Sequence, residues 1–263
     1  MPFTLAHAAA AYPLRRTGLV LSALIIGTFA PDLEFFLRFA PEGPFGHTAR
    51  GFFVFSLPVA FAVFWLFHDV VKEPLAALMP AAVRKRITPG IYPFSFRRLL
   101  LVLFSLLVGA STHLLWDAFT HGGYWPGRHF HWFWKTVTVP LLGELHYYKV
   151  LQYASTVFGL DVVFFWFLHW LRTAPTQDQP AGSSVPLNQT RAARVLIPAS
   201  VLLGALVRTL VGVSRPESPR EFQTWLVEFV VTAISLTWLE LMMWGFTLPV
   251  RVHSDLPPVA SAR

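Results

Sequence analysis

One stretch of the sequence carries three ionisable side chains at helical spacing. His113, Asp117 and His121 follow one another at intervals of four residues. Each step of four advances an α-helix by about 40°, so the three side chains lie along one narrow stripe. Imidazole nitrogens and carboxylate oxygens are ligands for zinc, manganese and iron. Because ionisable residues are costly within an apolar helix, we predict that this stripe belongs to a functional site.

The absence of cysteine restricts the chemistry of any metal site. None of the 263 residues is Cys, which excludes thiolate ligands, iron–sulfur clusters, thiol nucleophiles and a disulfide scaffold. Two further polar points stand beside apolar runs, with Asp32 ending the first run and His47 preceding the second. If the chain crosses a membrane six times, both lie at the same membrane face as Asp117 and His121. We therefore predict one site built from imidazole and carboxylate groups.

Each of these residues also has a structural interpretation. The His113, Asp117 and His121 stripe can form a polar network that positions helices without a metal ion. Asp32 follows a proline and can cap the start of a helix. His47 on its own is typical of a residue at the membrane interface. The metal interpretation is favoured because several such residues converge.

The elements that must position these side chains are long apolar helices. The chain is 54% hydrophobic and 13% charged, about half the usual charged share, and its mean hydropathy is +0.52. Five apolar runs approach or exceed the roughly 20 residues that cross a bilayer, namely 51–68, 99–116, 150–171, 195–213 and 225–248. Residues 18–30 are shorter and form either a sixth span or a re-entrant helix. The predicted fold is an all-α polytopic integral membrane protein with five or six transmembrane helices.

The composition along the chain predicts its domain organisation and location. Residues 1–172 form a membrane domain that carries the candidate site, and 173–192 read as a flexible polar linker. Residues 193–250 hold two further transmembrane helices, and 251–263 form a polar tail. We expect a multi-pass protein of the inner, cytoplasmic membrane. The net charge of +7 fits contact with anionic membrane lipids and gives no reason to expect nucleic acid.

The order of the polar motifs resembles that of a known family. The chain opens Met-Pro-Phe-Thr-Leu-Ala-His, and the Pro-Asp, His-Thr and His-x-x-x-Asp-x-x-Thr-His motifs follow in that order. This pattern resembles an uncharacterised family of bacterial integral-membrane proteins, which is similar to inner-membrane metal-dependent hydrolases. It is more distantly similar to zinc-dependent phospholipase C, an all-helical hydrolase with a multi-zinc site. The resemblance implies that six residues are metal ligands: His7, Asp32, His47, His113, Asp117 and His121.

The resemblance also implies the metal and its arrangement. We expect a divalent ion, zinc above all, with one or two ions bound and Asp117 as the bridge between them. The phospholipase has a later His-x-x-x-Glu pair that this sequence lacks at that spacing, which argues against a third ion and against a complete second metal position. The expected activity is metal-dependent hydrolysis of a phosphoester or lipid-linked substrate through a metal-activated water.

Further residues receive roles in this hypothesis. Asp32 and Asp117 are the candidate catalytic residues, and Asp32, if it is not a ligand, can act as the base that holds the attacking water. Arg50 and Arg128 are candidates for neutralising a substrate headgroup. Two neighbours of the ligands, Thr48 and Thr120, are candidates for hydrogen bonds that orient them.

The alternative is a non-catalytic membrane protein, either a transporter or a structural component. In that case the same His and Asp residues form a polar network or a metal-binding site. Ionisable residues in the later apolar runs keep this alternative open, and we predict that Arg208 pairs there with Glu228 or Glu240. The chain contains no Gly-rich phosphate loop, Gly-x-Ser-x-Gly elbow or His-Glu-x-x-His motif, so nucleotide-binding, serine-esterase and zincin functions lack support.

Overall fold

Five helical segments are long and apolar enough to cross a membrane. The computed structural model describes residues 3–90, 92–93, 95–140, 143–212 and 219–248. Within those residues the five segments are Ala49–Leu78, Phe96–Ala118, Tyr147–Thr173, Leu187–Gly212 and Glu221–Thr247. In the same described residues, the strands are limited to one short hairpin. The predicted all-α polytopic fold is therefore confirmed, with five spans.

The chain divides into two compact units. The first, called unit 1, comprises Met1–Phe35, Glu42–Phe64 and Phe94–Arg172. Its helical elements begin with η1 (Thr4–Ala10), α1 (Ala11–Leu14), α2 (Leu21–Gly27), η2 (Ala30–Asp32), α3 (Leu33–Arg38, which runs past the unit boundary), η3 (Phe45–His47), α4 (Ala49–Gly51), η4 (Phe52–Ser56) and α5 (Leu57–Leu66, which ends just past it). They continue with α8 (Phe96–Ala118), α9 (Trp125–His129), η6 (His131–Trp134) and α10 (Tyr147–Thr173).

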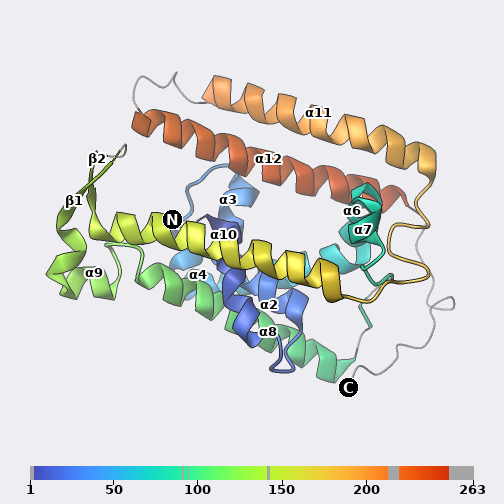
Figure 1. Cartoon of the computed structure of the whole chain (residues 1–263), viewed down its shortest axis with the longest axis horizontal. Helices are drawn as coiled ribbons and strands as arrows, with labels where there is room; N and C mark the ends of the chain where they lie inside the picture. The colour runs from blue at the N-terminus through green and yellow to red at the C-terminus, as the bar shows by residue number, and fades with distance from the viewer. Residues whose placement is uncertain (1–2, 91, 94, 141–142, 213–218, 249–263) are drawn as a thin grey trace. The chain divides into compact units, whose positions relative to one another are not determined.

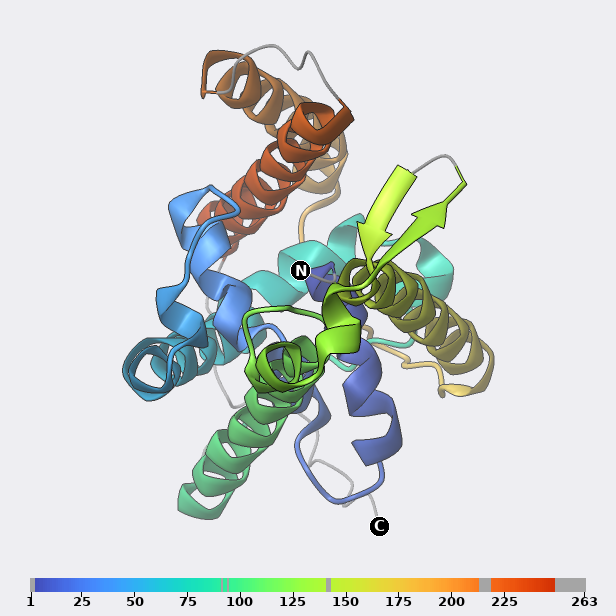
Figure 2. The ribbon, with the colours of Figure 1, turned by 90° about the vertical axis from the view of Figure 1, so that its left-hand side faces the viewer.

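The hairpin of unit 1 leads into its last helix. Strand β1 (Thr136–Val139) pairs antiparallel with β2 (Gly143–His146), with Thr136 opposite His146. Figure 2 shows the two strands extending from the N-terminal end of α10. Aromatic side chains are exposed around this hairpin, including Trp125, Trp132 and Trp134. Such aromatic residues are typical of a membrane–water interface.

Residues 18–30 do not form a sixth span. Their helix, α2, has only seven residues, which cover about 10 Å at 1.5 Å per residue. This short helix packs closely against α8. A Cβ atom on Gly27 would lie 2.5 Å from the Leu106 carbonyl oxygen, and one on Gly109 would lie 2.3 Å from that of Leu24. The absence of side chains at both glycines therefore lets the two backbones meet, as small residues do between membrane helices.

The second compact unit, unit 2, comprises Phe36–Pro41, Trp65–Pro93 and Thr173–Arg263. Its helices are η5 (Phe67–Val71), α6 (Lys72–Leu78), α7 (Ala81–Arg84), α11 (Leu187–Gly212) and α12 (Pro219–Thr247). The long helices α11 and α12 lie side by side (Figure 1). The apolar core of unit 2 is built on five residues from three of its elements: Val71, Ala193, Ile197, Val201 and Leu241.

These units do not follow the predicted domain boundaries. Residues 65–93 belong with the C-terminal helices rather than with the segment 1–172. The predicted linker 173–192 contains the start of α11. The linker residues that precede this helix form backbone hydrogen bonds with the segment that follows α7. Gln177 N–H donates to the Lys85 carbonyl, and Ala181 N–H donates to that of Ile87. Polar composition predicted flexibility here because sequence cannot show backbone hydrogen bonds to a distant segment. The predicted tail 251–263 lies outside the described residues.

Candidate metal centre

Five side chains that can ligate a metal converge in unit 1. They are called the His/Asp cluster here and comprise His7, Asp32, His47, His113 and Asp117. The first three lie in the short helices η1, η2 and η3, and the last two lie one turn apart on α8. One ligand atom each from His7, His113 and Asp117 lies within 4.8 Å of the others, and the same holds for Asp32, His47 and His113. The fold thus gathers five of the six predicted ligands.

Four ligand atoms of the cluster form a closed ring. His47 Nε2 lies 3.3 Å from Asp32 Oδ1 and 3.6 Å from Asp117 Oδ2. His113 Nε2 lies 3.5 Å from each of the same two oxygens. Ligand atoms held about 2.0–2.1 Å from a tetrahedral zinc ion are about 3.3–3.4 Å apart. The separations around the ring are therefore close to those of a four-coordinate metal site.

The other oxygen of Asp117 faces a different group of imidazoles. Asp117 Oδ1 lies 3.5 Å from His7 Nε2 and 3.7 Å from His121 Nδ1. The His7 ring also stacks on the His113 ring, with centroids 3.8 Å apart. The two oxygens of one carboxylate are thus directed to two sets of nitrogens. This arrangement is compatible with Asp117 as a bridge between two ions.

Hydrogen bonds from outside the cluster set the orientation of two of its members. His113 Nδ1–H donates to the Thr28 carbonyl oxygen at 2.7 Å, which leaves the Nε2 lone pair directed at the cluster. The Thr4 hydroxyl donates to Asp32 Oδ2 at 2.6 Å, which leaves Oδ1 facing the imidazoles. Metal-ligating side chains commonly have such outer partners, which fix the tautomer and the ring orientation.

Several ligand atoms of the cluster are buried without a hydrogen-bond partner. These atoms are His7 Nδ1 and Nε2, Asp32 Oδ1, His47 Nε2, His113 Nε2 and Asp117 Oδ1. Buried polar atoms are nearly always hydrogen-bonded, because leaving them without a partner costs free energy. A cation at the centre of the ring would satisfy the ring atoms among them together. The donor set, which is all imidazole and carboxylate, therefore fits a divalent ion such as zinc.

The protonation states of two cluster members suit metal ligation. Burial, together with the adjacent His113, lowers the pKa of His7 to about 3, so this imidazole is neutral at pH 7. Burial acts against ionisation of Asp32, but His113, His47 and the Thr4 hydroxyl outweigh it and lower the pKa of the carboxyl. Metal ions bind neutral imidazole and ionised carboxylate. Both residues can therefore act as ligands at neutral pH.

His121, the sixth predicted ligand, borders the cluster and belongs to neither group of three. Its Nε2 lies 3.3 Å from the Gln152 amide nitrogen, and its Nδ1 lies 3.1 Å from the Asp117 carbonyl oxygen. An amide N–H donates to Nε2, so Nδ1–H donates to the carbonyl. Gln152 is buried, and its oxygen accepts from Lys149 Nζ at 2.9 Å. Both nitrogens of His121 thus have protein partners, and its role as a ligand stays a prediction.

The other predicted site residues lie around the cluster. Thr120 is buried, and its hydroxyl lies 3.2 Å from His121 Nδ1. Thr48 caps α4, because its hydroxyl oxygen accepts from Gly51 N–H. Arg50 is exposed on α4, and the exposed Arg128 donates Nε–H to the Gly123 carbonyl at 2.8 Å. The substrate-binding role of the two arginines stays a prediction.

Sequence reasoning missed the residues that support the ligands. Thr4 reads from sequence as the cap of a first helix, but its hydroxyl holds Asp32, 28 residues away. Gln152 gives no local signal beyond being polar within an apolar run. Tyr124 also lies near the cluster, since burial and the charges of Asp117 and Asp32 raise its pKa to about 12. Its phenol is therefore protonated at neutral pH and can donate a hydrogen bond.

Comparison with known proteins identifies a family without assigning an activity. No curated protein and no solved structure matches the chain. Residues 1–246 match a family described as a domain of unknown function, DUF4184. This match includes all of unit 1, unit 2 as far as residue 246, and every residue of the His/Asp cluster. The chain, with its five spans and its buried imidazole and carboxylate groups, belongs to the DUF4184 family.

Proposed function

We propose that this protein is a membrane-embedded, metal-dependent hydrolase that acts on a phosphoester or lipid-linked substrate. The observation that carries the proposal is the ring of four ligand atoms from Asp32, His47, His113 and Asp117. A polar network that served only to join helices would pair its buried atoms by hydrogen bonds. Here Asp32 Oδ1, His47 Nε2 and His113 Nε2 lack such bonds, and the oxygen lies within 3.5 Å of both nitrogens. The arrangement favours a metal site, and zinc is a divalent ion that its imidazole and carboxylate donors can bind.

The cluster residues would bind the ion, and neighbouring groups would orient these ligands by hydrogen bonds. A bound divalent ion supplies a water nucleophile at neutral pH and a Lewis acid for a phosphoryl oxygen. Asp32 and Asp117 provide the anionic ligands, and the Thr4 hydroxyl and the Thr28 carbonyl keep Asp32 and His113 aligned. The protonated phenol of Tyr124 provides a hydrogen-bond donor near the two carboxylates. His7 and the second oxygen of Asp117 would begin a second metal position.

Metal content tests the proposal most directly. The full chain, purified in detergent and analysed by inductively coupled plasma mass spectrometry, should retain zinc at one equivalent or more. Asp117→Ala should lose it, because this carboxylate contacts both groups of imidazoles. Asp161→Ala provides a matched control, since Asp161 is exposed on α10 and outside the cluster. Equal metal content in wild type and Asp117→Ala would remove the basis of the proposal.

Activity then separates a hydrolase from a metal-binding protein without catalysis. The zinc-loaded chain should hydrolyse at least one of three substrate types: a phosphodiester, a phospholipid or a phosphomonoester. Hydrolysis should disappear in Asp117→Ala and persist in Asp161→Ala. Stoichiometric zinc with no hydrolysis of any of the three would favour the non-catalytic alternative, a transporter or structural component with a metal site.

A further inference from the structure

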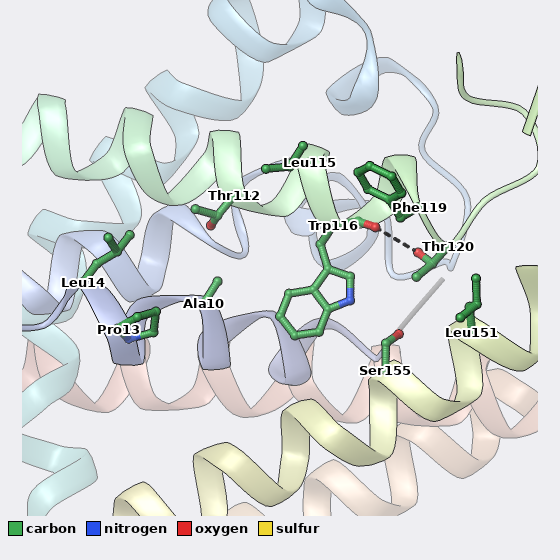
Figure 3. A pocket seen from close by; sticks show the side chains of 10 residues that line it. All are labelled: Ala10, Pro13, Leu14, Thr112, Leu115, Trp116, Phe119, Thr120, Leu151 and Ser155. Carbon is green, nitrogen blue, oxygen red and sulfur yellow. Dashed lines mark hydrogen bonds between the residues drawn. The ribbon is translucent and has the colours of Figure 1, made fainter. Parts of the chain in front are cut away.

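An open apolar groove lies beside the His/Asp cluster in unit 1. It has a volume of about 720 Å³, within the range of sites that bind small ligands. Figure 3 shows Trp116 reaching from α8 toward α10, with Ala10 and Pro13 on the N-terminal segment beside it. The remaining lining residues are Leu14, Thr112, Leu115, Phe119, Thr120, Leu151 and Ser155. Almost all of the surface that lines the groove is apolar.

The position of the groove indicates whether it is exposed to water or to membrane lipid. Its two long walls are α8 and α10, both of which are long and apolar enough to cross a membrane. Leu115 on α8, Phe119 directly after α8 and Leu151 on α10 are exposed at its edge. In a membrane, the outward face of such helices meets lipid, so the groove is accessible to hydrocarbon chains.

One end of the groove borders the metal centre. The indole of Trp116, which lines the groove, meets the His7 ring edge to face at a centroid distance of 5.5 Å. Thr120 lines the groove as well, and its hydroxyl lies 3.2 Å from His121 Nδ1. A molecule that filled the groove would therefore contact Trp116, which contacts His7 of the cluster, and Thr120, which contacts His121 at the border of the cluster.

Hydroxyl groups line the same end of the groove, and a positively charged side chain outside the lining bonds to the neighbouring Gln152. The Ser155 hydroxyl lines it and donates to the Gln152 carbonyl. The Gln152 amide in turn contacts both His121 and the ammonium group of Lys149. An occupant that matches this gradient has an apolar chain and an anionic end group. A free sugar phosphate or nucleotide would leave the apolar walls without a complementary surface.

We infer that the groove binds an acyl chain of a phospholipid and thereby directs its phosphate to the His/Asp cluster. This inference rests on the proposed function and narrows its substrate class from phosphoesters in general to membrane phospholipids. Lateral access from the bilayer would let the lipid reach the site while its chains remain in an apolar surrounding. Trp116 and Thr120 would then be positioning residues between the chain and the phosphate.

Photolabelling of the intact protein tests the inference without requiring turnover. The probe is a phosphatidic acid with a diazirine midway along one acyl chain, used in phosphatidylcholine nanodiscs that contain the full chain. Labelling should concentrate on the groove stretches 10–14, 112–120 and 151–155. Ala10→Phe should reduce it at least about tenfold, as expected for an overfilled apolar pocket. Because Ala10→Phe could disturb folding, Leu151→Trp at the exposed edge provides a second blocking variant.

The control is Phe158→Trp, which enlarges an exposed residue of α10 that does not line the groove. It should leave labelling unchanged, and all variants should retain zinc. Labelling spread evenly over lipid-facing residues, or equal in the blocking and control variants, would overturn the inference. Equal labelling by a diacylglycerol probe without phosphate would overturn the part played by the anionic end group.

Zinc content measured on the same samples separates this inference from the proposed function. Bound zinc with an unlabelled groove would contradict the phospholipid substrate and leave the metal-dependent hydrolase standing. Selective groove labelling in a protein that holds no zinc would contradict the hydrolase, and it would support the groove as a lipid-binding site.

Discussion

Glu73 and Glu240 of unit 2 and the His/Asp cluster of unit 1 are partnered in different ways. In unit 2, both oxygens of Glu73 accept backbone N–H groups, from Gly90 and Gly182. Glu240 likewise accepts the Ser200 hydroxyl at 2.8 Å. In unit 1, the His/Asp cluster keeps buried ligand atoms without hydrogen bonds. A polar residue within an apolar segment therefore does not indicate a functional site, whereas several unpartnered ligand atoms directed at one point do.

The interhelical contacts of unit 2 show why this distinction needs a structure. Sequence predicts that Arg208 pairs with Glu228 or Glu240. In the structure Glu240 bonds to Ser200, and Arg208 donates to the backbone carbonyl of Phe39. A hydroxyl and a backbone carbonyl thus serve as partners for these two charged side chains, as polar groups do between membrane helices, and the pairing of Arg208 with Glu228 stays a prediction.

Removing the metal should have the largest effect on stability, because the ion would be bound by the buried cluster of unit 1. A ligand present at 1,000 times its Kd stabilises a protein by about 4 kcal/mol, and a chelator would remove that contribution. EDTA should therefore lower the unfolding temperature of the wild type, measured by differential scanning fluorimetry. It should leave that of Asp117→Asn unchanged. Glu240→Gln, which alters the partnered carboxylate of unit 2, should respond to EDTA as the wild type does. If EDTA lowered the unfolding temperature of Asp117→Asn as much as that of the wild type, the assignment of the metal site to unit 1 would be contradicted.

The close approach of α2 and α8 gives the next largest expected effect. Gly27→Ala places a Cβ atom 2.5 Å from the Leu106 carbonyl oxygen, so a backbone has to move. Overpacking of this kind costs about 1–3 kcal/mol, and it should also weaken zinc binding because Thr28 supports His113. Gly123→Ala, which meets no atom within 4 Å, is the matched control. Thermal stability and zinc affinity that are equal in the two variants would show that this contact does not position the site.

Loss of the outer hydrogen bond to Asp32 should have an intermediate effect on the metal. Thr4→Val removes the hydroxyl that holds Oδ2 and keeps the side-chain volume. Removal of such an outer partner typically costs about 10–100-fold in metal affinity. Zinc titration against a competing chelator would measure it. Thr237→Val in unit 2, where the hydroxyl bonds only to its own helix at Ala233, should bind zinc as the wild type does. Unchanged affinity in Thr4→Val would contradict the orienting role.

The smallest expected effect belongs to a hydrogen bond of unit 2. Ser200→Ala removes the donor to Glu240. Hydrogen bonds between membrane helices average about 0.6 kcal/mol in double-mutant cycles. The loss of stability should be of this size, measured by unfolding in mixed detergent and denaturant. Zinc content should stay at the wild-type value, and a loss of zinc would contradict the separation of the units into a structural and a metal-binding part.

The sequence predicted the fold class and most of the site for identifiable reasons. Apolar length alone gave the five spans, because the bilayer sets a minimum length for a crossing helix. The spacing of four residues placed His113 and Asp117 on one face of α8 without any knowledge of tertiary structure. Both are local properties of the chain. The convergence of His7 with them depends on α2 being too short to span.

Other parts of the site depend on contacts between distant segments, which composition and spacing do not encode. Thr4 holds Asp32, and the carbonyl of Thr28 orients His113. Gln152 reaches His121 from the next long helix. In each case an ordinary polar group gains its importance from its position after folding. Residues 65–93 likewise group with helices more than 90 residues further along the chain, a contact pattern that composition does not encode.

The two oxygens of the Asp117 carboxylate face different imidazoles, and this has a consequence for the net charge of the metal centre. With neutral imidazoles, the His/Asp cluster contributes only the two negative charges of Asp32 and Asp117. One divalent cation would make this buried centre electrically neutral, which a low-dielectric surrounding strongly favours. A second cation, at the oxygen of Asp117 that faces His7, would leave an excess of two positive charges. The occupancy of that second position would therefore determine whether the centre attracts a phosphate dianion or remains indifferent to charge.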